Sequence, residues 1–112
     1  MIRKVAIPAN NGKLSSHFGH AKEFIWVELA ESEIISNKSF VPPAHEPGVL
    51  PKWLGELGAT DIIAGGMGQR AIQLFLDNNI NVYVGVPLKP VLELVEDLLN
   101  NRLEIGANYC NH

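Results

Sequence analysis

The alternation of apolar and polar residues in the first half of the chain predicts strands. Residues 2–9 are apolar and β-branched and run into the turn residues Asn10, Asn11 and Gly12, which indicates a first strand followed by a loop. Residues 24–29 are apolar on both alternating faces, as in a central strand. After a turn at residues 31–32, residues 34–41 complete a hairpin. Their polar centre, 36–39, is typical of a sheet edge.

Helical spacing begins after the proline-rich segment 41–48. Residues 50–57 carry apolar side chains at i, i+3, i+4 and i+7, and Gly58 stands in the position of a C-cap glycine. A short strand over 60–64, a helix ending near Asn78 and a strand over 81–86 follow. A third helix starts near Pro90, and we expect its core-facing side to consist of Leu88, Val91, Leu92, Val95, Leu98 and Leu99.

This order of elements predicts an α/β fold in three layers, α/β/α. Helical crossovers join parallel strands, whereas the hairpin is antiparallel, so the sheet should be mixed. A length of 112 residues fits a single domain over residues 1–112. Residues 103–112 show no periodicity, and we expect a flexible tail there.

Composition and charge narrow the functional classes. The net charge is −3, and the nine lysines and arginines form no basic stripe, which disfavours nucleic-acid binding. The chain has neither a signal-peptide pattern nor an apolar run of membrane-spanning length, so we expect a cytoplasmic protein without membrane contact. The single cysteine, Cys110, cannot form an internal disulfide.

Histidines and the cysteine are the candidate metal ligands. His17 and His20 are three residues apart in the polar loop 15–20, and Cys110 and His112 form a second pair of donors near the C-terminus. Neither pair completes a site, so each would need further donors such as His45. The alternatives are two solvated loop histidines and a disordered tail with a chance cysteine.

The segment 64–70 is a glycine-rich turn between a strand and a helix. Backbone amides at a helix N-terminus favour anions, and glycines allow an anion to approach closely. The segment lacks the lysine and hydroxyl residue of a P-loop, so it supports nucleotide binding only weakly. A tight turn explains the glycines equally well, and both interpretations can hold together.

Catalytic patterns are missing from the sequence. Asp61 is the only carboxylate near an inner strand, so the paired acids of two-metal nucleases are absent. We find neither a Ser-His-Asp pattern of recognisable spacing nor a GxSxG elbow. We therefore expect that the protein is not an enzyme.

Four segments together resemble the nitrogenase iron-molybdenum cofactor biosynthesis family: residues 5–8, 16–21, 45–48 and 64–68. The resemblance implies a ribonuclease H-like fold with a mixed five-stranded sheet, and a carrier or accessory role in binding iron-molybdenum cofactor or a related Mo/Fe/Cu-sulfur cluster. The family's motif histidine falls on His17, and Cys110 with His112 matches a C-terminal pattern of some short members. The cofactor-binding residues expected are Ser16, His17, Phe18, Gly19, Gly65, Gly66, Met67, Gly68 and Arg70, and the expected metal ligands are His17, His20, His45, Cys110 and His112.

Two hypotheses from different classes follow. The first is a non-catalytic carrier of a metal-sulfur cluster, acting as a monomer or weak homodimer with a protein partner for delivery. The second is a binding or sensor module for a small anion at the glycine-rich turn, with the histidines as bystanders. An undetected enzyme ranks last.

Overall fold

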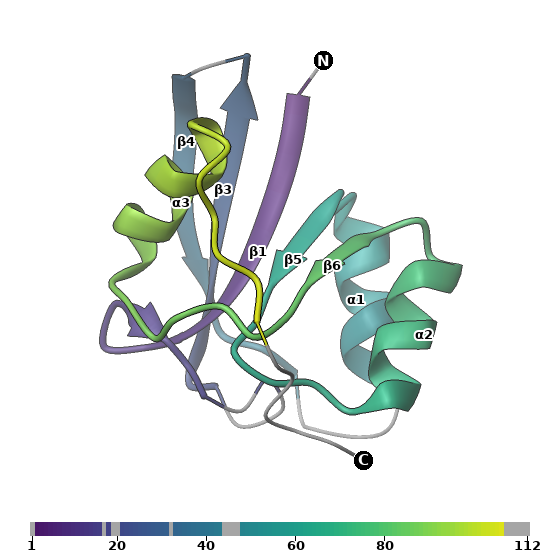
Figure 1. The fold of residues 1–112 in the computed structure, drawn as a ribbon. Helices are drawn as coiled ribbons and strands as arrows, with labels where there is room; N and C mark the ends of the chain where they lie inside the picture. The colour runs from purple at the N-terminus through teal and green to yellow at the C-terminus, as the bar shows by residue number, and fades with distance from the viewer. Residues whose placement is uncertain (1, 17, 19–20, 32, 44–47, 107–112) are drawn as a thin grey trace.

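The computed structural model describes residues 2–16, 18, 21–31, 33–43 and 48–106. Apart from the short strand β2, its strands and helices follow one another in the order expected from the sequence (Figure 1). The elements are β1 (Ile2–Asn10), β2 (Lys13–Leu14), β3 (Glu23–Ala30), β4 (Glu33–Phe40), α1 (Val49–Leu57), β5 (Asp61–Ile63), α2 (Gln69–Asp77), β6 (Asn81–Tyr83) and α3 (Val91–Leu99).

The sheet is mixed, and β1 is the strand at which its two halves meet. The strand order is β4-β3-β1-β5-β6, with β2 paired to β1. β3 pairs antiparallel with both β1 and β4, while β5 runs parallel to β1 and β6 runs parallel to β5. The hairpin, the edge position of β4 and the parallel second half are thus confirmed.

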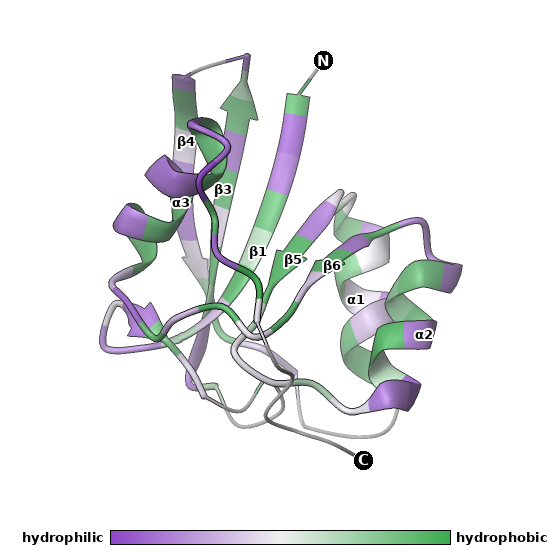
Figure 2. Cartoon of the chain, viewed as in Figure 1, coloured by the Kyte–Doolittle hydropathy of each residue, from purple (hydrophilic) through white to green (hydrophobic). Residues whose placement is uncertain are grey.

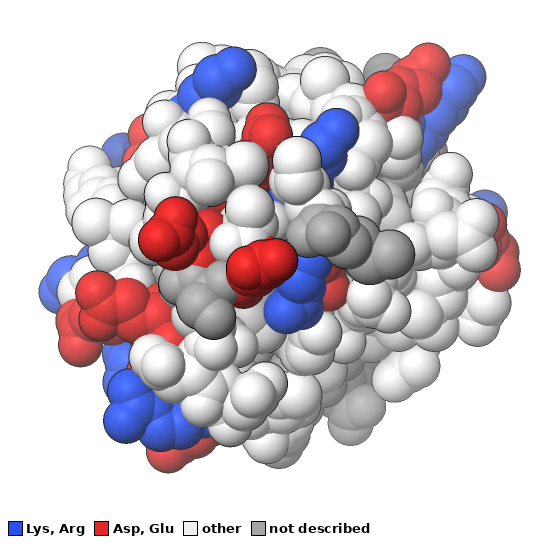
Figure 3. All heavy atoms as spheres, turned by 90° about the horizontal axis from the view of Figure 1, so that it is seen from above, with Lys and Arg blue, Asp and Glu red and all other residues white. Residues whose placement is uncertain are grey.

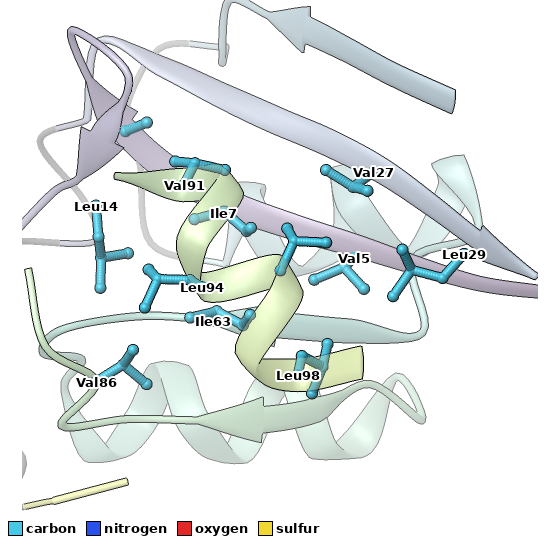
Figure 4. Packing of buried hydrophobic residues seen from close by; sticks show 12 residues of the cluster. Val5, Ile7, Leu14, Val27, Leu29, Ile63, Val86, Val91, Leu94 and Leu98 are labelled. Atoms are coloured by element: carbon cyan, nitrogen blue, oxygen red, sulfur yellow. The ribbon is translucent and has the colours of Figure 1, made fainter. Parts of the chain in front are cut away.

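Helices cover both faces of the sheet, which confirms the three layers. Alternate residues of β1 point to opposite faces: Val5 and Ile7 pack with α3, and Ala6 packs with α1 and α2. Figure 4 shows Leu94 and Leu98 of α3 above this first face. Figure 2 shows apolar residues in the inner strands β1, β3 and β5, polar residues along much of the edge strand β4, and polar residues on the outer sides of α2 and α3.

The core-facing side of α3 differs from the prediction. Leu88 and Leu92 are 51 % and 52 % exposed, whereas Leu94 is fully buried. The buried positions of the helix, Val91, Leu94, Val95 and Leu98, have the spacing i, i+3, i+4 and i+7. Leu92 is rotated by about 100° from Val91. Leu88 precedes the N-cap residue Pro90, so the helical phase does not extend to it.

The structure also contains a hairpin that was not predicted from the sequence, and one strand is shorter than predicted. Asn11 and Gly12 both have positive φ angles, 54° and 81°, and connect β1 to the short strand β2. Such a two-residue turn favours the sequence Asn-Gly, so the signal was present. β6 ends at Tyr83 instead of Val86, and Gly85 two residues later has a φ of 70°.

The chain beyond α3 returns toward the end of β6. Leu103 packs against the core formed with α3, and Gly106 lies beside the carbonyl of Gly85. Figure 1 shows this segment crossing the front of the sheet. Residues 107–112, the greater part of the expected tail, lie outside the described residues. In the described part of the chain, no helix is long and apolar enough to cross a membrane.

Candidate functional site

The candidate site lies at the carboxyl ends of the parallel strands β1, β5 and β6. Ligands of parallel α/β sheets bind at this edge, because the strand-to-helix turns and helix N-termini meet there. The turn after β5 and the chain after β6 are joined by two hydrogen bonds. Gly85 N–H donates to the carbonyl of Gly65 at 3.0 Å, and Val86 N–H donates to the carbonyl of Ala64 at 3.4 Å.

Gly65 is the point at which three segments converge. A β-carbon added at this residue would lie 2.9 Å from Cδ2 of Leu88, 3.3 Å from the carbonyl oxygen of Ser15 and 3.6 Å from Cα of Ser16. The backbone oxygen of Ser15 cannot move aside as a flexible side chain could. Glycine at position 65 therefore lets the loop after β2 pack directly against the glycine-rich turn.

The N-terminus of α2 provides a positive local field. Its N-cap is Gly68, which has no side chain to cap the helix, and its first turn contains no acidic residue. Arg70 in this turn is exposed. Since a helix N-terminus carries partial positive charge, a cation here is unfavourable for the helix by itself. The same arrangement favours a bound anion.

The aromatic ring of Phe18 anchors the loop to the core. It is buried and packs edge-to-face against Phe75 of α2 at 5.3 Å and Phe24 of β3 at 6.3 Å, measured between ring centroids. Met67 is also buried in the same cluster. These two side chains contribute to the site by fixing the backbone on either side of it.

The structure thus brings together two of the predicted segments. Ser16 is exposed beside Gly65, and Gly66 and Gly68 continue toward the start of α2. Leu88 is a contact that sequence reasoning did not foresee, because its apolar character suggested the core of α3. The predicted residues outside the described part of the chain are His17, Gly19, His20, His45, Cys110 and His112. Among the described residues, no three His, Cys, Asp or Glu side chains gather into a metal site.

Asp61 lies at the opposite end of the parallel strands and is 1 % exposed. Arg3 donates to both of its carboxylate oxygens, at 3.2 and 3.1 Å, and Thr60 and Asn81 donate to it at 2.7 and 3.2 Å. Burial would raise the pKa of Asp61, but the hydrogen bonds from Arg3 and Thr60 outweigh it and lower this pKa below the ordinary value. All the donors named here stabilise the ionised carboxylate, which is typical of a structural ion pair.

Comparisons with known proteins cover most of the chain. A family model described as dinitrogenase iron-molybdenum cofactor matches residues 1–101. The protein MJ0580 of Methanocaldococcus jannaschii, described as uncharacterized, is 30 % identical over 88 residues, which cover 73 % of this chain and 74 % of the relative.

Two solved structures share the fold. The crystal structure of PH0822 superposes with a TM-score of 0.85 at 28 % identity, over 91 % of this chain and 93 % of that one. The apo form of the orange protein from Desulfovibrio gigas gives a TM-score of 0.79 at 20 % identity, over 96 % of each chain. At that identity, the second likeness shows the fold alone.

Proposed function

Because the chain belongs to the dinitrogenase iron-molybdenum cofactor family, we propose that it is a non-catalytic protein that carries a metal-sulfur cluster as cargo. The observation that supports this most is the contact at Gly65. There the backbone of Ser15 and Ser16, which leads directly into His17, packs against the glycine-rich turn. A metal-ligand donor and an anion-binding turn would then act on the same cargo.

The charge and donor types suit a metal-sulfur cluster. Such clusters carry negative charge on their sulfides, which the N-terminal amides of α2 and Arg70 can stabilise. His17 and Cys110 would supply bonds to metal, with His20, His45 and His112 as further donors. This role needs Ser16, Phe18 and Gly19 to present His17, and Gly65, Gly66, Met67 and Gly68 to shape the turn.

Cys110 is within reach of this turn along the chain. Gly106 lies beside Gly85, which is hydrogen-bonded to Gly65. Cys110 is four positions after Gly106, and four residues span at most about 14 Å. A single thiolate also suits a carrier, because cargo held by few protein bonds can be released to a protein partner.

Reconstitution without oxygen tests the proposal. The protein is incubated with tetrathiomolybdate and ferrous or cuprous ions, separated from free reagents, and analysed for metals, sulfide and charge-transfer absorbance. We expect a stoichiometric protein-bound cluster, and we expect His17→Ala and Cys110→Ala to lose most of it. Gln73→Ala on the exposed side of α2 serves as control and should bind normally. A wild-type protein with no bound metal and no such absorbance would refute the carrier role.

The uncapped start of α2 also favours a second candidate, a binding module for a small anion. In that case molybdate or sulfate alone would bind, and Arg70→Glu would weaken binding while His17→Ala and Cys110→Ala would not. The two candidates therefore differ in their dependence on His17 and Cys110. Isothermal titration with each anion on these variants distinguishes them.

A further inference from the structure

Asn10 is the last residue of β1 and stands where the pairing between β1 and β3 ends. The final pair of that ladder is Ala9 with Glu23, and Asn10 itself pairs with Lys13 of β2. The chain between β2 and β3, residues 15–22, forms the segment that contains His17 and His20. Asn10 therefore lies between the two ends of this segment.

The carboxamide of Asn10 contacts both ends. Its Oδ1 accepts a hydrogen bond from the backbone N–H of Lys22 at 2.8 Å, and its Nδ2 donates to Oγ of Ser15 at 3.3 Å. The backbone N–H can only donate, which fixes the oxygen toward Lys22 and the nitrogen toward Ser15. An amide side chain is suited to this position because it carries an acceptor and a donor at once.

We infer that Asn10 is a positioning residue, whose carboxamide ties Ser15 and Lys22, the two ends of the segment 15–22, to the end of β1 beside the glycine-rich turn. This inference rests on the proposed function for its consequence, but not for its geometry. Ser15 is 4 % exposed, and its carbonyl oxygen is one of the groups that crowd Gly65. Ser15 is also fixed by its own N–H, which donates to the carbonyl of Pro8 at 2.8 Å.

The Lys22 end is where Asn10 contributes most. The β1–β3 ladder stops one residue later in the chain, at Glu23, so the side chain of Asn10 extends the pairing by one hydrogen bond. Ordering a backbone residue costs conformational entropy, and this hydrogen bond orders Lys22 before any ligand binds. A donor on the segment is then presented to a ligand without that cost at binding.

Two variants separate the effect of the Asn10 hydrogen bonds from the effect of charge near the site. Asn10→Leu has similar size and loses both hydrogen bonds. Asn10→Asp retains an acceptor for Lys22 N–H and can accept from the Ser15 hydroxyl, but it adds a negative charge. Asn100→Leu is the matched control, because Asn100 uses its side chain to donate to the carbonyl of Glu96 at the far end of α3.

Amide hydrogen exchange of the ligand-free protein, resolved by residue, measures directly how well the hydrogen bond to Asn10 protects the Lys22 amide. In Asn10→Leu we expect the amide of Lys22 to exchange about tenfold faster. In Asn10→Asp and in Asn100→Leu its rate should stay near that of the wild type. Far-UV circular dichroism establishes that each variant is folded. An unchanged exchange rate of the Lys22 amide in folded Asn10→Leu would overturn the inference. If that variant does not fold, the exchange rates of Ser15→Ala, which loses the contact with the Asn10 side chain, and of Asn10→Asp, which retains it, are compared instead.

Cluster uptake from tetrathiomolybdate and ferrous ions measures the consequence. We expect Asn10→Leu to bind the cluster about tenfold more weakly than the wild type, with altered charge-transfer absorbance, although the net charge of the variant is unchanged. Wild-type affinity for the cluster in that variant, despite faster exchange of the Lys22 amide, would show that the Asn10 hydrogen bonds do not contribute to binding. If the wild type takes up no cluster, the proposed function fails, while the exchange rates still decide whether Asn10 holds the segment.

Discussion

The two ends of the parallel strands β1, β5 and β6 are built in opposite ways. At the amino end, the buried carboxylate of Asp61 is balanced by Arg3 and by further hydrogen-bond donors. Figure 3 shows this end from outside, with acidic and basic residues interspersed over the surface. At the carboxyl end, backbone groups and glycines dominate, and α2 starts without a side-chain cap.

This difference separates stability from binding along one set of strands. The amino end satisfies its charges internally, so a ligand would gain little by binding there. The carboxyl end leaves helix amides directed at its turn and keeps Gly65 free of a side chain, as a ligand site requires. Substitutions at the two ends should therefore have different consequences.

The largest effect is expected at Gly65. Gly65→Val places a branched side chain against Leu88 and the backbone of Ser15, and overpacking of this kind costs about 2–3 kcal/mol. The loop should move away from the turn, and cluster uptake should be lost. Urea unfolding and anaerobic uptake measure both effects. Gly55→Ala, where the nearest group is the flexible side chain of Asn78, should be tolerated. Normal uptake by Gly65→Val would contradict the site.

The next effect is at the amino end. Arg3→Leu removes the cation from buried Asp61, and we expect the free energy of unfolding to fall by about 2 kcal/mol. This is less than the loss expected for a fully buried ion pair, because the side chain of Arg3 is 38 % exposed. Cluster uptake should be unchanged. Arg102→Leu, beyond the end of α3, is the control and should have little effect on stability. Loss of uptake in folded Arg3→Leu would show that the two ends are not independent.

Acid should weaken the amino end specifically. Since the pKa of Asp61 is lower in the folded state than in the unfolded chain, its contribution is complete above the unfolded pKa of about 3.9 and is lost as pH falls through the folded pKa. Asp61→Asn removes this titration. Between pH 5 and pH 2 the unfolding free energy of the variant should therefore decrease less than that of the wild type. Urea unfolding across this pH range measures both free energies. Parallel pH profiles of the unfolding free energy in the wild type and Asp61→Asn would refute the prediction.

The smallest change in stability, with opposite sign, is expected at Arg70. Arg70→Glu replaces a cation with an anion in the first turn of α2, which should stabilise the folded protein by about 0.5 kcal/mol. Binding of an anionic cluster should weaken about fivefold or more, since the favourable field is reversed. Arg102→Glu makes the same change in net charge elsewhere and should leave binding near the wild-type value. Unchanged binding by Arg70→Glu would show that the N-terminus of α2 takes no part in binding the cluster.

Local patterns in the sequence predicted much of the fold because they report short-range constraints. The spacing of apolar residues 50–57 identified α1, and Gly58 ends it with a φ of 91°, as a C-cap glycine should. The polar centre of β4 correctly indicated a sheet edge. The core-facing side of α3 was predicted wrongly, because it included Leu88, which precedes the helix, and the exposed Leu92, and it omitted the buried Leu94.

The sequence by itself determined the family, the order of the main strands and helices, and the residue types available for a ligand. Only the tertiary structure decided which of them meet, because the contact of Ser15 with Gly65 spans fifty residues and depends on the pairing of β1 with β5. The same pairing brings Arg3 to Asp61, 58 residues away. Periodicity and turn chemistry act over a few residues, whereas such contacts follow from the order of strands in the sheet.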